Sequence, residues 1–198
     1  MIISIKTVKN GKIKIYADGE EYFTVPAVIW YSSSFRDGDD VDEEDLLLLK
    51  SKGEASFAFD SGMRLLSLRM HSEYELKHKL TLKFSKEASE SAMERLKQLG
   101  LIDDEKFAVM YAEELSRRKG FSSKRILMEL KNRGIDGNYA QNAVNALDID
   151  PEISIIRVIE KCGLTENSTD KEKNRVIRRL INMGYSYGDI SKYINFND

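Results

Sequence analysis

The spacing of apolar residues is typical of strands at the start of the chain and of helices later. Three short apolar runs lie within residues 1–26, and the dipeptides Asn10-Gly11 and Asp18-Gly19 separate them. These dipeptides favour the positive φ angles of two-residue hairpin turns. The sequence therefore predicts three short antiparallel strands.

Such a sheet needs a cover on its apolar face. We expect the cover to be a helix from Asp42 to Lys50, which Gly53 would end. Residues 35–45 are strongly acidic. A metal site or a site for a basic partner is conceivable there, but a loop followed by the acidic first turn of a helix is the simpler interpretation. Residues 1–53 are expected to form a platform separate from the rest of the chain.

From Glu54 onward the apolar spacing is helical, and it recurs about every fifty residues. Three segments share an apolar residue, a leucine four positions later, and an apolar residue followed by a capping Ser or Asp. They are Leu76, Leu80 and Phe84-Ser85; Ile126, Leu130 and Ile135-Asp136; and Val176, Leu180 and Tyr185-Ser186. Such an array predicts units that bury their apolar faces together, as three-helix repeats at 54–103, 104–150 and 151–198.

Helix-capping signals fall where this division requires them. They are the pairs Ser72/Glu75 and Thr169/Glu172, the Asp150-Pro151 helix start, and the glycines Gly134 and Gly184 at helix ends. The predicted fold class is mainly α, a tandem array of three three-helix repeats preceded by a small antiparallel β-sheet plus helix.

Composition indicates a globular, charge-rich chain. Its 198 residues are 41% hydrophobic and 32% charged, with a net charge of −2, so nucleic-acid binding would need a local basic patch. The single cysteine, Cys162, excludes an intrachain disulfide and is expected to be a small core residue. The chain start does not resemble a signal peptide, and the longest apolar runs are too short for a bilayer. We expect a soluble, cytoplasmic monomer.

Residues that could support catalysis or metal binding are sparse. His71 and His78 lack the further ligands that a metal site needs, and Asp103-Asp104-Glu105 is better explained as the acidic start of a helix. No phosphate-binding glycine loop or nucleophile motif is present. We therefore predict no catalytic residues, no metal and no cofactor, and a protein that is not an enzyme.

Basic residues form two clusters on equivalent helices of the second and third repeats. Phe121 lies within the first cluster, and Lys171 and Lys173 belong to the second. Solvated helix faces are the alternative interpretation, but two matching clusters can form a stripe that suits phosphates or an acidic protein groove. The predicted partner-binding residues are Arg117, Arg118, Lys119, Lys124, Arg125, Lys131, Arg133, Arg175, Arg178 and Arg179.

Several stretches resemble the RecX family of regulatory proteins. They are Leu65 to Ser72 with Glu75-Leu76 and Leu80, the junction from Gly100 to Ala108, and Arg118-Lys119-Gly120 with Ile126, Glu129-Leu130 and Arg133-Gly134-Ile135. The resemblance covers residues 55–150 well and the third repeat more loosely. The strand-rich start is similar to the extension of Gram-positive members.

The resemblance implies a non-enzymatic modulator of the RecA recombinase. Family members bind along the groove of the RecA–DNA filament and typically limit its growth, and with it recombination, DNA repair and the SOS response. The implied partner is the RecA filament, with single- or double-stranded DNA as an additional ligand of the basic stripe. The shared motifs are mostly caps and core positions, so they identify the fold more firmly than the contact residues.

The alternative function is direct DNA or RNA binding of the helix-turn-helix type. Such a protein presents basic and base-reading residues at the start of one helix in each unit. The third helices here are expected to start at Ser85, Asp136 and Ser186, with neutral or acidic openings. These openings argue against sequence-specific reading.

Overall fold

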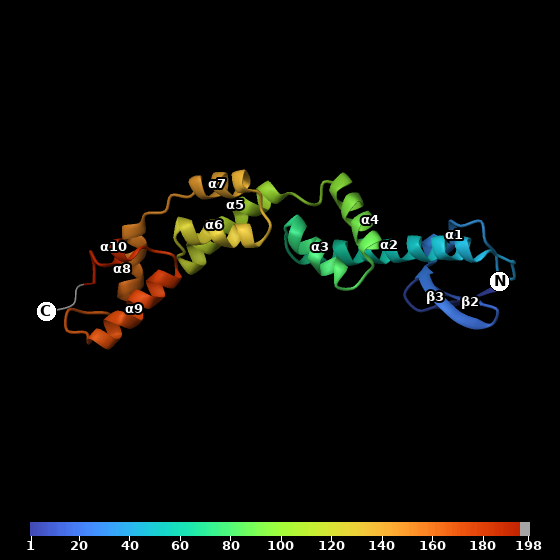
Figure 1. Cartoon of the computed structure of the whole chain (residues 1–198), viewed down its shortest axis with the longest axis horizontal. Helices are drawn as coiled ribbons and strands as arrows, with labels where there is room; N and C mark the ends of the chain where they lie inside the picture. Colours follow the sequence, from blue (N-terminus) through green and yellow to red (C-terminus); the bar gives the residue numbers. More distant parts are fainter. Residues whose placement is uncertain (195–198) are drawn as a thin grey trace. The chain divides into compact units, whose positions relative to one another are not determined.

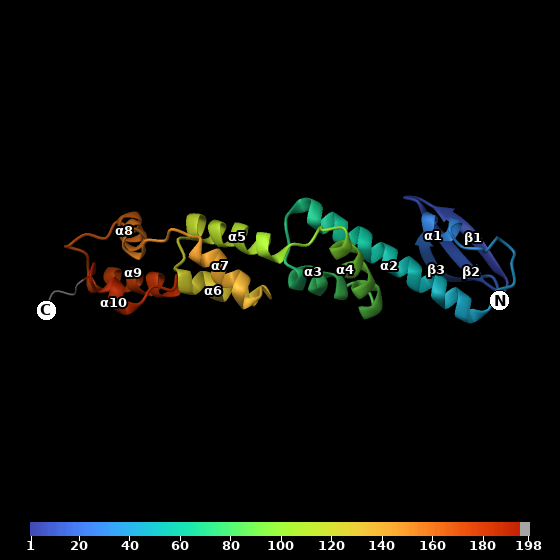
Figure 2. The same ribbon diagram turned by 90° about the horizontal axis from the view of Figure 1, so that it is seen from above.

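The computed structural model describes residues 1–194, which form two compact units (Figures 1 and 2). Residues 1–102 make up the first unit, and the described residues from Asp103 onward make up the second. No helix among the described residues is both long enough and apolar enough to cross a bilayer.

The first unit starts with the predicted three-stranded antiparallel sheet, in the order β1-β2-β3. Its strands are β1 (Ile3–Val8), β2 (Lys12–Ala17) and β3 (Glu20–Pro26). Asn10 and Gly11 both have a φ of 65°, and Asp18 and Gly19 have φ values of 50° and 89°. The predicted two-residue turn is confirmed at Asp18-Gly19, since Ala17 pairs with Glu20, whereas Val8 pairs with Lys12 and the first hairpin has a three-residue loop that contains Asn10-Gly11.

One face of the sheet is buried against α1 (Ala27–Tyr31) and the first half of α2 (Glu43–Leu68). The helical side of this core is made by Trp30, Leu46 and Leu49. The expected helix end at Gly53 is wrong, because α2 continues through it for 26 residues in all.

Close packing on the sheet is the reason for a glycine at position 53. A Cβ atom there would lie 2.4 Å from Cγ1 of Val25 on β3, so any larger residue would push the helix off the sheet. The expected boundary between residues 53 and 54 therefore falls inside a continuous helix. The sheet shares this helix with the first repeat and is not a separate platform.

The acidic residues 35–45 form a loop and a helix start, as the simpler interpretation predicted. The Asp37 carboxylate accepts a hydrogen bond from the backbone N–H of Ile5 at 2.8 Å, and Asp40 pairs with the N-terminal ammonium of the chain at 2.8 Å. Asp42 is the N-cap residue of α2, whose first turn carries three further acids. Asp37 and Asp40 thus hold the loop against β1 and the start of the chain.

The first repeat consists of the second half of α2, α3 (Glu73–Thr81) and α4 (Lys86–Gln98). Gly62 of α2 lets α4 come close, because a Cβ there would lie 2.6 Å from Cδ1 of Leu96. The hydroxyl groups of Ser72 and Ser85 accept hydrogen bonds from backbone N–H groups of α3 and α4, as the predicted N-caps should.

The second unit holds the other two repeats. Its elements are α5 (Asp104–Glu114), the π-helical turn η1 (Leu115–Lys119), α6 (Ser123–Asn132), α7 (Gly137–Asn145), α8 (Pro151–Lys161), α9 (Asp170–Asn182) and α10 (Tyr187–Ile190). Thr169 and Glu172 form a complete capping box, and Asp150 caps α8 ahead of Pro151. The predicted fold class is confirmed.

Cys162, which we expected in the core, is exposed. The apolar face of α8 buries Ile155 and Val158. Cys162 would be the next residue on this face, but the helix ends at Lys161, so Cys162 lies outside the core. Arg179 donates a hydrogen bond to its Sγ atom at 3.6 Å.

Candidate partner-binding surface

The turn η1 presents three consecutive basic residues to solvent. Arg117, Arg118 and Lys119 are exposed, Leu115 anchors the turn in the core, and Gly120 ends it with a φ of 65°. This turn directly continues α5 and forms the end of that helix. Arg118 pairs with Glu114 at 3.2 Å, but both groups are exposed, so the pair contributes little stability.

Repeats two and three are joined by hydrogen bonds directly after η1, one between backbone groups and one from a side chain to the backbone. The N–H of Ser122 donates to the carbonyl of Met183 at 3.0 Å, and the hydroxyl of Tyr185 donates to the carbonyl of Gly120 at 2.8 Å. Burial raises the pKa of Tyr185, which keeps its hydroxyl protonated as the donor. These bonds fix α6 against α9.

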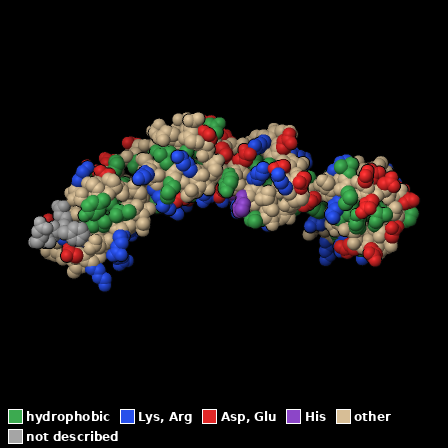
Figure 3. All heavy atoms as spheres, in the orientation of Figure 1, with side chains coloured by type: hydrophobic (Ala, Val, Ile, Leu, Met, Phe, Trp, Pro, Cys, Tyr) green, Lys and Arg blue, Asp and Glu red, His purple; other side chains and the backbone are tan. Residues whose placement is uncertain are grey.

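This junction creates what we call the α6–α9 face, which joins the two basic clusters. A shallow groove of about 700 Å³ and a neighbouring groove of about 290 Å³ run along it. The face consists of Phe121, Lys124, Arg125, Met128, Lys171, Arg175, Arg178, Arg179, Ile181, Asn182 and Met183. Apolar side chains are flanked by cations there, and Figure 3 shows Lys and Arg side chains projecting from α9.

Not every basic residue of the sequence clusters reaches this face. Lys173 is only 6% exposed, so its expected place in a solvent-facing cluster is wrong. Position 173 belongs to the inner face of α9, one turn ahead of the buried Ile177. Arg133 lies over the ring of Tyr111 at 4.7 Å, at the other end of α6, and the exposed Lys131 is at that end too. Neither lines a groove of the face.

Arg125 is more deeply placed than its neighbours. Its guanidinium lies 5.4 Å from the ring centre of Phe121 and pairs with Glu129 at 2.7 Å. We expect Arg125→Glu to lower the free energy of unfolding by about 2 kcal/mol, because the new carboxylate would be half-buried and one turn from Glu129.

Urea denaturation of Arg125→Glu, beside Lys124→Glu as a control, tests this expectation. Lys124 is exposed, and its reversal should change the free energy of unfolding by less than about 0.5 kcal/mol. Equal stability of the two variants would show that Arg125 is an ordinary surface residue.

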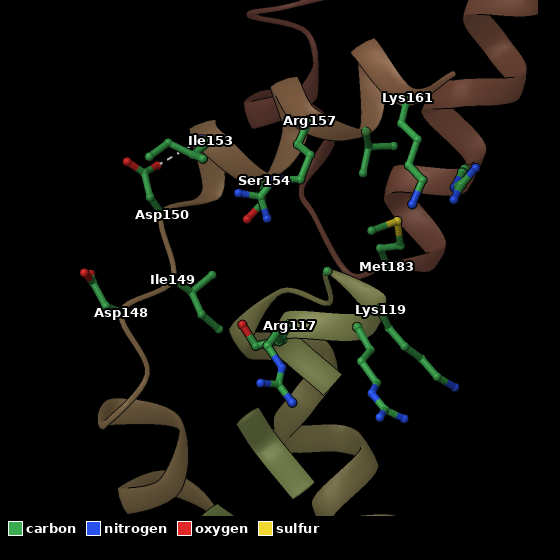
Figure 4. A pocket seen from close by; sticks show the side chains of 15 residues that line it. Arg117, Lys119, Asp148, Ile149, Asp150, Ile153, Ser154, Arg157, Lys161 and Met183 are labelled. Atoms are coloured by element: carbon green, nitrogen blue, oxygen red, sulfur yellow. Dashed lines mark hydrogen bonds between the residues drawn. The ribbon is translucent and has the colours of Figure 1, made fainter. Parts of the chain in front are cut away.

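A second concave region, here the η1–α8 groove, has a volume of about 480 Å³ (Figure 4). Its cations are Arg117, Arg118, Lys119, Arg157, Lys161 and Arg179. Arg157 and Lys161 are not among the partner-binding residues predicted from the sequence, because they are interleaved with the apolar stripe of α8. Their spacing of four residues, which places them on one helix face, was the available signal.

The first and second repeats match family models of known proteins. Residues 58–96 match the first three-helix domain of RecX, and residues 103–144 match the second. The regulatory protein RecX of Chlorobaculum tepidum is 31% identical over 72% of this chain and 89% of its own length. The chain belongs to the RecX family. The family is one of regulatory proteins, which gives the chain a regulatory role.

Other relatives extend the similarity to nearly the whole chain. The regulatory protein RecX of Pectobacterium atrosepticum is 33% identical over 69% of this chain and 95% of its own length. That of Caldanaerobacter subterraneus subsp. tengcongensis is 28% identical over 96% of both chains. A crystal structure of regulatory protein RecX has a TM-score of 0.64 and 21% identity over 98% of both chains, which shows the same fold.

Proposed function

We propose that this chain is a non-enzymatic regulator that binds RecA–DNA filaments and inhibits recombinase activity, and with it the DNA-damage response. Its membership of a regulatory family supports this proposal. Three repeats in tandem suit a partner that also repeats, because linked modules engage it with high effective concentration.

The observation that carries the proposal is the composition of the α6–α9 face. Among the described residues, Lys124, Lys171, Arg175 and Arg178 have no ion pair with a carboxylate. Lys124 lines the smaller groove together with the exposed apolar side chains of Met128 and Ile181, and the other three line the larger groove together with Phe121 and Met183. Unneutralised cations beside apolar groups are complementary to a protein surface that carries acidic and apolar residues together.

Sequence-specific DNA reading of the helix-turn-helix type has less support. The third helix of the last repeat, α10, spans only Tyr187–Ile190, and that of the second repeat begins after Asp136, an acidic cap. A recognition helix combines base-reading side chains with cations that contact phosphates, and α7 contains neither Lys nor Arg. DNA in the filament is therefore proposed as a secondary ligand, contacted through its phosphates.

Co-sedimentation with RecA filaments and with bare single-stranded DNA, at about 150 mM salt, tests the proposal. We expect at least about tenfold tighter binding to filaments. At this salt the release of counterions from DNA contributes less free energy, so the affinity for bare DNA is low. Equal retention on both would contradict filament recognition and favour the direct nucleic-acid binder.

A further inference from the structure

The η1–α8 groove is chemically different at its two ends. Figure 4 shows Asp148, Ile149, Asp150 and Ile153 along one side, on the linker before α8 and its first turn. Lys119, Lys161 and Met183 lie toward the other side in Figure 4, and Arg179 is a further cation of the lining. A ligand with an uncharged, hydrogen-bonding end and a strongly anionic end would match this difference.

The cationic end is built from three separate elements. Lys119 belongs to η1, Arg157 and Lys161 to α8, and Arg179 to α9. None of these four has an ion pair with a carboxylate in the part of the chain that the structure describes. Like charges held together on helices repel each other, and an oligophosphate removes that repulsion while accepting several charge-assisted hydrogen bonds.

The other end has groups that suit a nucleobase. Ile149 and Ile153 supply apolar surface for a flat ring. The carboxylate of Asp150 is already engaged by the backbone N–H groups of Glu152 and Ile153, at 2.8 and 3.3 Å, as the cap of α8. Asp148 is exposed at the mouth of the groove, and a carboxylate is an acceptor for base amino groups.

We propose that the η1–α8 groove is a binding site for a nucleoside triphosphate. Its phosphates lie among Lys119, Arg157, Lys161 and Arg179, and its base lies on Ile149 and Ile153 with N–H donors toward Asp148. The volume of about 480 Å³ is within the usual range of about 300–1,000 Å³ for small-molecule sites.

A continuous nucleic-acid strand fits this groove less well. A strand that passes through it would bring a phosphate next to Asp148 and Asp150, and like charges at that distance repel. A nucleotide avoids the repulsion because its charge is confined to one end. Guanine suits Asp148 best, since its ring N–H and its amino group are adjacent donors.

Calorimetric titration of the full-length protein with GTP at about 150 mM salt tests the proposal, and no filament is needed. We expect saturable binding that the double variant Arg157→Ala/Lys161→Ala weakens at least about tenfold, a loss of about 1.4 kcal/mol. The matched double variant Lys83→Ala/Lys86→Ala removes two exposed cations from the first repeat and should bind GTP as the unchanged protein does.

Two further titrations distinguish the contribution of the base to the affinity from that of the phosphates. Asp148→Ala should weaken GTP but not inorganic tripolyphosphate, which has no base. Absence of saturable GTP binding, or equal affinity for GTP and tripolyphosphate, would overturn the nucleotide assignment. It would also be overturned if a twenty-nucleotide oligothymidylate bound more tightly than GTP and lost this affinity in the α8 double variant, since the groove would then hold a strand.

Discussion

Reversal of three exposed cations on α9, by Lys171→Glu, Arg175→Glu and Arg178→Glu, should abolish filament binding and inhibition of strand exchange. The three residues recur at intervals of four and three positions, so they share one helix face. Each reversal replaces attraction to an acidic partner by repulsion, and we expect a combined loss of at least about a hundredfold in affinity, mainly in association rate.

The stability of this triple variant should be nearly unchanged, within about 1.5 kcal/mol, because all three side chains are exposed. A matched control reverses three exposed lysines outside the α6–α9 face, Lys83, Lys86 and Lys106, which gives the same change of net charge. Strand-exchange assays measure the inhibition by both variants, and thermal unfolding checks that both are folded. Full inhibition by a folded α9 variant would show that its cations are merely solvated.

Replacement of Gly184 by alanine should unfold the junction between the second and third repeats. Gly184 has a φ of 92°, and a Cβ there would lie 2.4 Å from Oγ of Ser122 and 2.7 Å from Cβ of Arg125. Both contacts are too short for any real side chain, and Ser122 is held in place by its bond to Met183. We expect a loss of about 3 kcal/mol or more in the free energy of unfolding.

Gly163→Ala separates backbone strain from the close contact. Gly163 also has a positive φ, of 67°, but a Cβ there would meet no atom within 4 Å. This variant should lose only about 1 kcal/mol, the cost of the left-handed conformation alone. Chemical denaturation measures the free energy of unfolding of both glycine variants. Equal losses would show that α6 and α9 move apart at little cost to accommodate the added methyl group.

The features that the sequence predicted correctly are local ones. A hairpin turn such as Asp18-Gly19 and a capping box such as Thr169/Glu172 depend on residues a few positions apart, and each has a distinct chemical signature. Gly184 was likewise expected at the end of its helix, and it lies there.

The features that the sequence did not predict depend on contacts between distant segments. Gly53 can end a helix or admit a neighbour, and only the position of Val25 against it reveals the second role. The exposure of Cys162 depends on where α8 stops.

The candidate surfaces were predicted in part. The basic character of α6 and α9 is evident from composition. By contrast, the addition of Arg157 and Lys161 to the cations of η1 requires α8 to pack beside that turn, which no short-range pattern encodes. Burial of Lys173 likewise depends on the packing of its inner helix face.

Because α2 is unbroken, it fixes the rotation of the sheet about the helix axis relative to the rest of the first repeat. Each residue of an α-helix adds a rotation of about 100° and a rise of about 1.5 Å. The sheet contacts the helix around Gly53, whereas α4 contacts it around Gly62, so nine residues of helix set the angle between the two contacts. One residue inserted between them would turn the sheet by about 100° about the helix axis while leaving each core locally intact. The length of α2 between Gly53 and Gly62 thus fixes the rotation of the N-terminal sheet relative to the first repeat, and only insertions of whole numbers of turns would preserve it.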